Sequence, residues 1–163
     1  MAGQMAIYEE EQKQFAEICE RLVRDALAKA IFIVDKDGQL ITATGETTGI
    51  DTTGLASLAA GSTAATGGLA LMLGEEEFPV HFHEGTRNHL HVSLIGDLLI
   101  LLVIFDERSS LGLVRLRVKR AYADMEKVLE TLKGRSAEAQ NQAMDIFGEI
   151  TDDDIDSLFN DAF

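Results

Sequence analysis

The sequence has few of the residues that mark a secreted or metal-stabilised protein. Its 163 residues include one cysteine, Cys19, one proline and no tryptophan. A single cysteine excludes an internal disulfide and any zinc site built from cysteine pairs, which is typical of a reducing compartment. No such crosslink is needed, because a domain of this length buries about 70% of the surface that its unfolded chain exposes. We expect Cys19 to be a small residue of the hydrophobic core.

Positive charge is also scarce. The 14 basic residues face 28 acidic ones, so the formal net charge is −14. This charge repels phosphate backbones and anionic lipids, which makes nucleic acids and membrane surfaces poor partners. The first twelve residues lack the basic and apolar regions of a secretory signal, and the longest apolar run, residues 98–105, is too short to span a bilayer. We therefore expect a cytoplasmic protein that binds other proteins and does not insert into a membrane.

Hydrophobic periodicity predicts three helices and five strands in the order α-β-β-α-β-β-β-α. Residues 98–105 are apolar at every position, which indicates a central strand covered on both faces. Pro79 cannot donate a hydrogen bond to a neighbouring strand, so its strand should lie at a sheet edge. The predicted elements are a helix over 9–29, strands over 30–35 and 39–44, a helix over 52–73, strands over 78–83, 89–94 and 98–105, and a helix over 111–132.

The helix over 52–73 carries a line of small residues. Each glycine inside a helix costs about 0.5 to 1 kcal/mol relative to alanine, so a series of them needs a reason. We expect another macromolecule to approach this line closely; packing on the chain's own sheet is the alternative. The line, which we call the small-residue seam, consists of Gly54, Ser57, Gly61, Ala64 and Gly68.

Four histidines lie on the two strands that follow this helix. A turn over 84–88 would set His83 opposite His89 and His81 opposite His91 on one sheet face, where imidazoles could converge on zinc or copper. No carboxylate or thiolate accompanies them, and a register shift of one residue would disperse the set. We expect no metal and no cofactor, and a histidine-cluster metal-binding domain remains an alternative.

Motifs of catalysis are missing. The stretch GSTAATGG over 61–68 has no lysine and is not a phosphate-binding loop. No serine lies in a nucleophile elbow, and Cys19 belongs to the apolar stripe of its helix. We therefore expect no catalytic residues and no active site.

The last thirty residues differ from the rest of the chain. Residues 134–163 hold one basic and eight acidic residues, a net charge of −7. The polar stretch over 134–142 predicts a flexible linker between a domain over 1–133 and an acidic tail. Within the tail, residues 145–159 form an amphipathic motif in which Thr151 and Asp154 resemble a capping box. A solubilising tail is the alternative, but the apolar residues predict docking to a partner through Ile150, Ile155, Leu158 and Phe159.

The chain resembles a Roadblock-type domain over residues 8–133. The resemblance rests on the element order, the seam and the segment FIVDKDGQLITATGETTGIDTTGLASLAAG, and FDERSSLGLVRLRVKRA and DDDIDSLF support it. It implies an α+β fold of the Roadblock and profilin-like type, an α/β sandwich with a five-stranded antiparallel sheet. It also implies a homodimer in which the edge strand, with Phe78, Val80 and Phe82, pairs across a two-fold axis.

The resemblance also implies a function. Roadblock members of this kind bind a small Ras-like GTPase, two chains to one GTPase, and accelerate GTP hydrolysis in bacterial cell polarity and motility, in some cases at a cell pole. They reposition the switch regions of the GTPase without inserting an arginine finger. Ala64 and Gly68 match the contact positions, with the rest of the seam beside them, and the tail would reach a second GTPase surface and modulate exchange. A scaffold that only tethers a GTPase is the alternative, and Arg87 or Arg108 could act as a finger.

Overall fold

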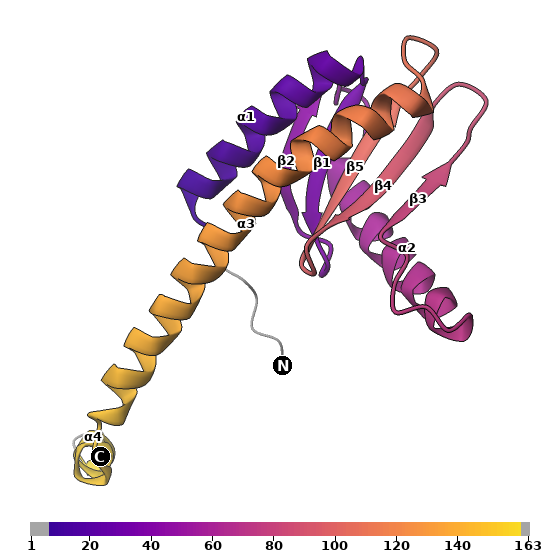
Figure 1. Cartoon of the computed structure of the whole chain (residues 1–163). Helices are drawn as coiled ribbons and strands as arrows, with labels where there is room; N and C mark the ends of the chain where they lie inside the picture. Colours follow the sequence, from indigo (N-terminus) through magenta and orange to yellow (C-terminus); the bar gives the residue numbers. More distant parts are fainter. Residues whose placement is uncertain (1–6, 161–163) are drawn as a thin grey trace.

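The most apolar stretch of the sequence forms the central strand of a five-stranded antiparallel sheet. The computed structural model describes residues 7–160 and orders the strands β2-β1-β5-β4-β3 (Figure 1). All of β5 except Ile104 is buried, as expected for a strand covered on both faces. The elements are α1 (Glu9–Ala26), β1 (Ala30–Asp35), β2 (Leu40–Gly45), α2 (Thr52–Met72), β3 (Val80–His83), β4 (His89–Ile95), β5 (Leu99–Phe105), α3 (Leu111–Gly148) and α4 (Asp152–Asn160).

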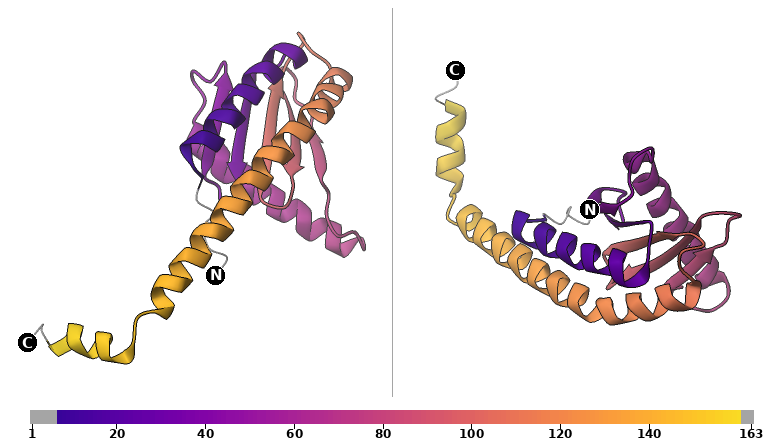
Figure 2. Two further views of the ribbon diagram at one scale, coloured as in Figure 1. Left: turned by 60° about the vertical axis from the view of Figure 1, so that its left-hand side comes forward. Right: turned by 90° about the horizontal axis from the view of Figure 1, so that it is seen from above.

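The two faces of the sheet carry different helices (Figures 1 and 2). Helices α1 and α3 lie side by side on one face, where α1 packs on β2 and α3 on β4, while α2 packs on β1, β2 and β5 from the other face. Because successive strand residues point to opposite faces, the sheet contributes to two cores. The core under α1 and α3 includes Phe15, Cys19, Ile31, Leu101, Phe105 and Met125, and the core under α2 includes Phe32, Val34, Ala56, Ile100 and Leu102.

Strand β3 lies at an edge of the sheet, as Pro79 predicts. It pairs with β4 alone within the described chain. The strand is shorter than expected, because Phe78 and Pro79 precede it and only Val80 and Phe82 of the predicted edge residues belong to it. The Pro79 carbonyl still accepts a hydrogen bond from the Leu94 N–H at 2.9 Å. The outer edge of β3 therefore offers a short row of backbone groups to a second strand.

Helix α3 continues through the segment that the sequence predicts as a linker. It spans 38 residues, so the expectation of a flexible stretch over 134–142 is wrong. Alanine, glutamate, glutamine and arginine in this stretch are good helix formers, and a helix already packed on the core extends without a new nucleus. Arg135 also fixes the extension, because its Nη1 lies 3.2 Å from Oε1 of Glu11, a carboxylate with 1% exposure, and its guanidinium lies 5.6 Å from the centre of the Tyr8 ring.

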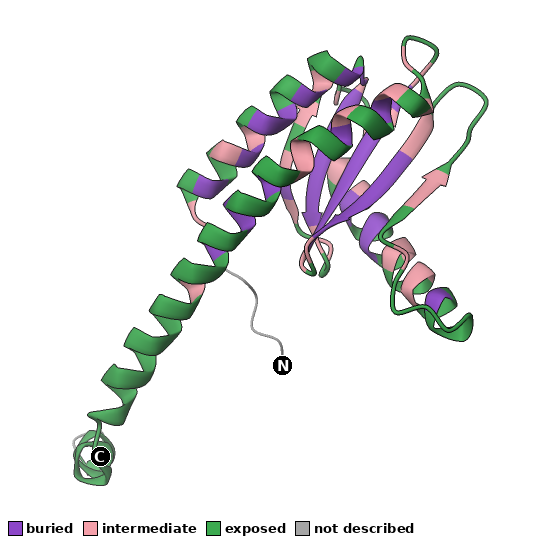
Figure 3. Cartoon of the chain, in the orientation of Figure 1, coloured by how far each residue is buried: buried purple, intermediate pink, exposed green. Residues whose placement is uncertain are grey.

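The C-terminal segment forms a second helix after a short break. The backbone N–H and the hydroxyl of Thr151 both donate to the Asp154 carboxylate at 2.9 Å, so the predicted capping contact is present. The amphipathic motif over 145–159 is divided between the end of α3 and α4, and no residue of α4 is buried (Figure 3). The division of the chain at residue 133 stays a prediction, since α3 runs continuously across it.

The continuity of α3 can be tested at Gly134. Proline at this position removes a backbone donor and should cost about 3 kcal/mol of helix stability with a loss of helix content. Alanine should add up to about 1 kcal/mol, since no heavy atom lies within 4 Å of the position of its Cβ. Circular dichroism and urea unfolding measure both effects. A linker would accept Gly134→Pro and Gly134→Ala with no change in helix content, and that result would contradict the continuous helix.

Candidate functional site

Helix α2 begins and ends at the residues that the sequence indicates. Asp51 is the N-cap, and its Oδ1 accepts the Gly54 N–H at 3.0 Å. The chain leaves the helix through Gly74, whose φ of +79° favours glycine. Between these ends lie 21 residues without a charged side chain. The helix therefore lacks the charged face that surface helices of globular proteins usually present to water.

The small-residue seam lies on the surface of the described chain. A Cβ built on Gly61, Gly67 or Gly68 would meet no heavy atom within 4 Å, so nothing in this chain requires a glycine there. The alternative that the seam packs on the chain's own sheet is therefore wrong. Of its five residues, Gly54 is half-buried. The other four are exposed: Ser57, Gly61, Ala64 and Gly68.

Three stripes run along α2. The buried stripe consists of the alanines Ala56, Ala59, Ala60 and Ala70. The seam lies beside it, because the next residue along a helix is turned by 100°. The outer stripe is apolar and uncovered: Leu58 is 75% exposed and Met72 is 83% exposed. The C-terminal half of the helix projects beyond the sheet on the side of β3 (Figures 1 and 2).

Sequence periodicity does not identify the exposed leucines of α2 as a surface for binding another protein. By length and composition, α2 is the one helix within residues 7–160 that is apolar enough to cross a membrane, and little of it is buried. A search for unbroken apolar runs misses this helix, because glycine, serine and threonine interrupt it. Its alanine stripe is packed on the sheet. A row of exposed leucines on the other side of such a helix is typical of a protein-protein contact.

The four histidines do not come together. Strands β3 and β4 pair His83 with Leu90, His81 with Val92 and Phe82 with His91, one residue away from the expected register. His81 and His83 therefore lie on the α2 face, and His89 and His91 lie on the α3 face. Within residues 7–160 no group of three or more histidines, cysteines or carboxylates could hold a metal ion. The four-histidine metal site is thus wrong.

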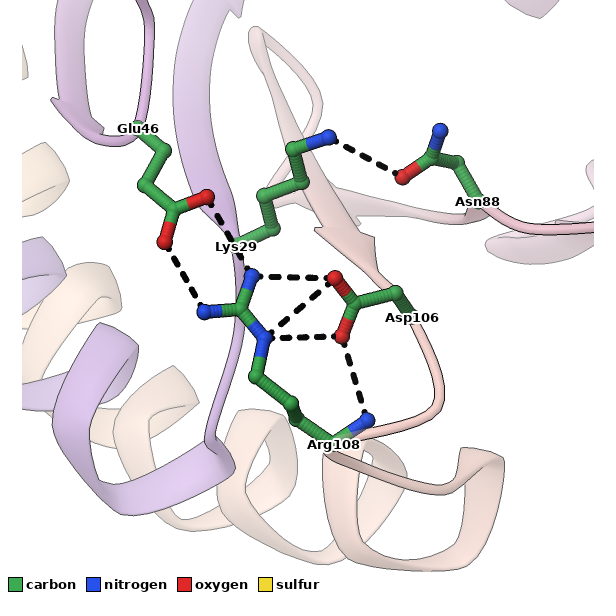
Figure 4. A network of polar contacts seen from close by, with 5 residues as sticks. All are labelled: Lys29, Glu46, Asn88, Asp106 and Arg108. Atoms are coloured by element: carbon green, nitrogen blue, oxygen red, sulfur yellow. Dashed lines mark hydrogen bonds and ion pairs between the residues drawn. The ribbon is translucent and has the colours of Figure 1, made fainter.

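Arg108 is held by two carboxylates on the loops that follow β2 and β5 (Figure 4). Its Nη1 lies 2.8 Å from Glu46 Oε1, its Nη2 lies 2.9 Å from Asp106 Oδ2, and its Nε donates to Asp106 Oδ1 at 3.0 Å. The hydrogen bonds from Arg108 lower the pKa of Asp106 to about 2 and also lower the pKa of Glu46. Beside them Lys29 Nζ donates to Asn88 Oδ1 at 3.3 Å. The Arg108 contacts join the loops that follow β2 and β5, and both carboxylates bind its guanidinium.

The predicted tail-docking residues are all exposed. Leu158 and Phe159 are 73% and 68% exposed, and Ile150 and Ile155 are also uncovered. Acidic side chains occupy the first turn of α4 at Asp152, Asp153 and Asp154, where they interact favourably with the helix dipole. The helix is therefore capped and charged for stability, while no residue of its apolar side is buried within the described chain.

The comparison with protein families settles the class of the chain. Residues 14–105 match the Roadblock/LC7 domain. The chain belongs to the Roadblock/LC7 family. The match covers the sheet, most of α1 and the whole of α2, so the seam lies within the shared domain. None of the curated proteins compared matches this Roadblock chain.

Solved structures add more specific relatives. MglB from Myxococcus xanthus is 53% identical, with 78% of this chain and 96% of that chain covered and a TM-score of 0.74. The gliding protein MglB from Thermus thermophilus is 29% identical, with 80% and 99% covered and a TM-score of 0.73. A structure described as MglB with tetrameric arrangement is 28% identical, with 81% and 99% covered and a TM-score of 0.75. The Roadblock fold predicted from the motifs is confirmed, and the solved structures add a likeness to MglB.

His91 should make the stability of this Roadblock chain depend on pH. Burial, and secondarily the charge of Arg115, lower the pKa of His91 from 6.5 to about 4. Between these pH values the unfolded state binds a proton that the native state does not, so the free energy of unfolding falls as the pH decreases from 6.5 towards 4. At higher pH the residue is neutral in both states and has no effect on the slope.

Urea unfolding at a series of pH values measures this dependence. His91→Gln removes the titrating group and should flatten the slope between pH 6.5 and 4. The control His83→Gln changes an exposed histidine of the neighbouring strand and should retain the slope. Equal slopes in the two variants would show that His91 is not the source.

Proposed function

We propose that the chain is a homodimeric GTPase-activating protein for a small Ras-like GTPase of the MglA type, in bacterial cell polarity and motility. The observation that carries this proposal is the exposed small-residue seam of α2 in a chain 53% identical to MglB. A seam of glycine, alanine and serine supplies no general acid or general base. It suits a regulator that acts on the active site of another protein in the cytoplasm, concentrated in some cases at a cell pole.

The proposed dimer forms through the edge strand β3. The strand has an unpaired outer edge within the described chain, Val80 is 45% exposed, and Phe78 lies shortly before it. The C-terminal half of α2 projects on the same side of the sheet (Figures 1 and 2). A second copy added at this edge would therefore extend the sheet beneath the uncovered end of α2. Burying each large apolar side chain there would contribute about 1.5 to 3 kcal/mol before the entropy of association is subtracted.

One GTPase would lie across the seams of the two copies. Because the seam has no side chain longer than serine, a loop of the GTPase can approach the helix backbone closely. The proposed catalytic effect is positional: contact with the seam holds the switch regions so that the GTPase's own residues align with the attacking water. The exposed residues of α4 would contact a second surface of the same GTPase and modulate nucleotide exchange.

Arginine in the seam should block this complex. Ala64 is exposed, so Ala64→Arg leaves the fold of the chain intact but holds the two surfaces apart. We expect GTPase binding in a pull-down and stimulation of GTP hydrolysis to be lost, with an unchanged dimer in size-exclusion chromatography. Ala137→Arg, at an exposed position of α3, adds the same side chain outside the seam and should bind normally. Binding by the Ala64 variant would remove the seam from the interface.

Stimulation should not depend on an arginine from this chain. Arg108 is engaged by Glu46 and Asp106, and Arg87 lies in the exposed connection between β3 and β4. We expect Arg87→Ala and Arg108→Ala to stimulate GTP hydrolysis to within a few-fold of the unaltered chain. An arginine finger contributes about 10³ to 10⁵ in rate, so a loss of that size in either variant would identify one.

A scaffold that binds the GTPase without activating it is the second candidate, favoured because the seam carries no ionisable side chain. Multiple-turnover GTP hydrolysis with and without the chain distinguishes the two. An activator raises the turnover rate in proportion to the amount of chain added, whereas a scaffold binds the GTPase and leaves the rate unchanged.

A further inference from the structure

A hollow lies between α3 and the β3–β4 side of the sheet, on the face opposite to α2. Its volume is about 470 Å³. The walls are largely apolar and come from Val80 of β3 and from Val118 and Tyr122 of α3. Neither α1 nor α2 lines it, so it is separate from the seam. Sequence patterns do not reveal it, because its parts are brought together only by the packing of α3 on β4.

The floor of the hollow contains two buried polar side chains without partners. His91 is 2% exposed and Ser93 is 4% exposed, and both line the hollow. Within residues 7–160, His91 Nδ1 and Ser93 Oγ have no hydrogen-bond partner. Buried polar groups in native proteins are nearly always paired, so these two atoms leave hydrogen-bonding capacity unused at the floor of the hollow.

The rim of the hollow is positively charged. Arg115 and Lys119 lie one turn apart on α3, where side chains at i and i+4 share a face. No acidic residue lines the hollow, and neither cation has an ion pair within the described residues. A matching ligand therefore has apolar groups for the walls and carboxylates for the rim. A simple inorganic anion would leave the apolar walls uncovered.

Helix α4 has this chemistry. Asp152, Ile155, Asp156 and Phe159 follow one another at steps of three, one and three, so they share one face. The two carboxylates are spaced i to i+4, as are Arg115 and Lys119. Ile155 and Phe159 lie beside them and are uncovered. One face of α4 thus presents two apolar side chains and two carboxylates, and the carboxylates have the same i to i+4 spacing as the two cations.

The α4 helix cannot reach the hollow of its own chain. Helix α3 is continuous from Leu111 to Gly148, and about 44 Å of helix separates Lys119 from its C-terminal end. The two views in Figure 2 and the view in Figure 1 agree that α4 lies at the far end of α3, away from the sheet. Its matching surface must therefore belong to another molecule.

We propose that α4 of a second copy docks in the hollow between α3 and β4, with Asp152 and Asp156 on Arg115 and Lys119 and with Ile155 and Phe159 against the apolar walls. The contact joins different surfaces of the two copies, and it lies on the sheet face opposite to the α2 seam. Variants in the hollow therefore test this contact without altering the proposed GTPase surface.

Thiol crosslinking between two full-length variants tests the contact directly. Cys19 gives no background, because it is buried and burial raises its pKa to about 12. One variant carries Leu158→Cys at the border of the docking face. The other carries Gly112→Cys, one turn before Arg115, where a side chain meets no heavy atom within 4 Å. We expect a short bismaleimide to join residues 158 and 112 of different chains, as identified by mass spectrometry.

A control variant carries Glu130→Cys, exposed on the same helix about 27 Å further along. It should give no product with the Leu158→Cys variant. Equal products at 112 and 130, or no product at 112, would overturn the proposal. A chain that carries both Gly112→Cys and Leu158→Cys and crosslinks only within itself would overturn it as well, because α4 would then reach its own hollow.

Charge reversal provides a second measurement. Arg115→Glu with Lys119→Glu should weaken association beyond the dimer at least about tenfold in sedimentation velocity. Arg120→Glu with Lys127→Glu makes the same charge change at exposed positions outside the hollow and should leave association unchanged. Asp152→Lys with Asp156→Lys should restore association with the first variant. Equal weakening by both pairs, or no rescue, would contradict the proposed contact.

Discussion

The fully buried residues of helix α2 are all alanines, and much of the molecule's behaviour depends on this constraint. An alanine contributes little apolar area, so the helix is attached to the sheet by a narrow stripe, and Leu58, Leu69 and Leu71 face solvent. Long charged side chains that could shield such leucines are missing from the helix. A helix of this kind gains stability when another protein covers it. The same constraint explains why the seam is smooth, since a surface for close approach cannot carry bulky residues.

The two faces of the sheet separate the two kinds of contact. The α2 face is uncharged and apolar, and it suits a partner that approaches the helix backbone. The face with α1 and α3 has a cationic hollow in a chain whose net charge is −14, so its natural ligand is an acidic segment. A partner selected by one surface is poorly suited to the other. A GTPase on the seam and an acidic segment in the hollow therefore do not exclude each other, although an α4 helix docked in a hollow is not free to contact the GTPase.

Much of the fold could be predicted from local patterns. The central position of β5 followed from its unbroken apolar run, and the edge position of β3 followed from Pro79. The seam was also predicted, because helical spacing alone decides which residues share a face. The exposure of Leu58 and Met72 could not be predicted in this way, since periodicity shows a stripe but not which stripe the sheet covers.

Two errors came from features that depend on distant contacts. The register of β3 and β4 is set by the packing of Phe82 and Val92 on opposite faces of the sheet, and a shift of one residue separated the histidines of β3 from those of β4. The helix over 134–142 depends in part on the pair between Arg135 and Glu11, which are 124 positions apart. The hollow at His91 is of the same kind, because strand and helix meet there only in the folded chain.

The long helix α3 determines what the C-terminal segment can do. If residues 134–142 were flexible, α4 could fold back on its own domain and the local concentration would favour that contact. A continuous helix anchored by Glu11 and Arg135 holds α4 away from the sheet instead (Figure 2). The acidic and apolar face of α4 is then available only to other molecules. Rigidity in α3 thus converts a potential autoinhibitory segment into an intermolecular contact, and its strength rises with the concentration of the partner.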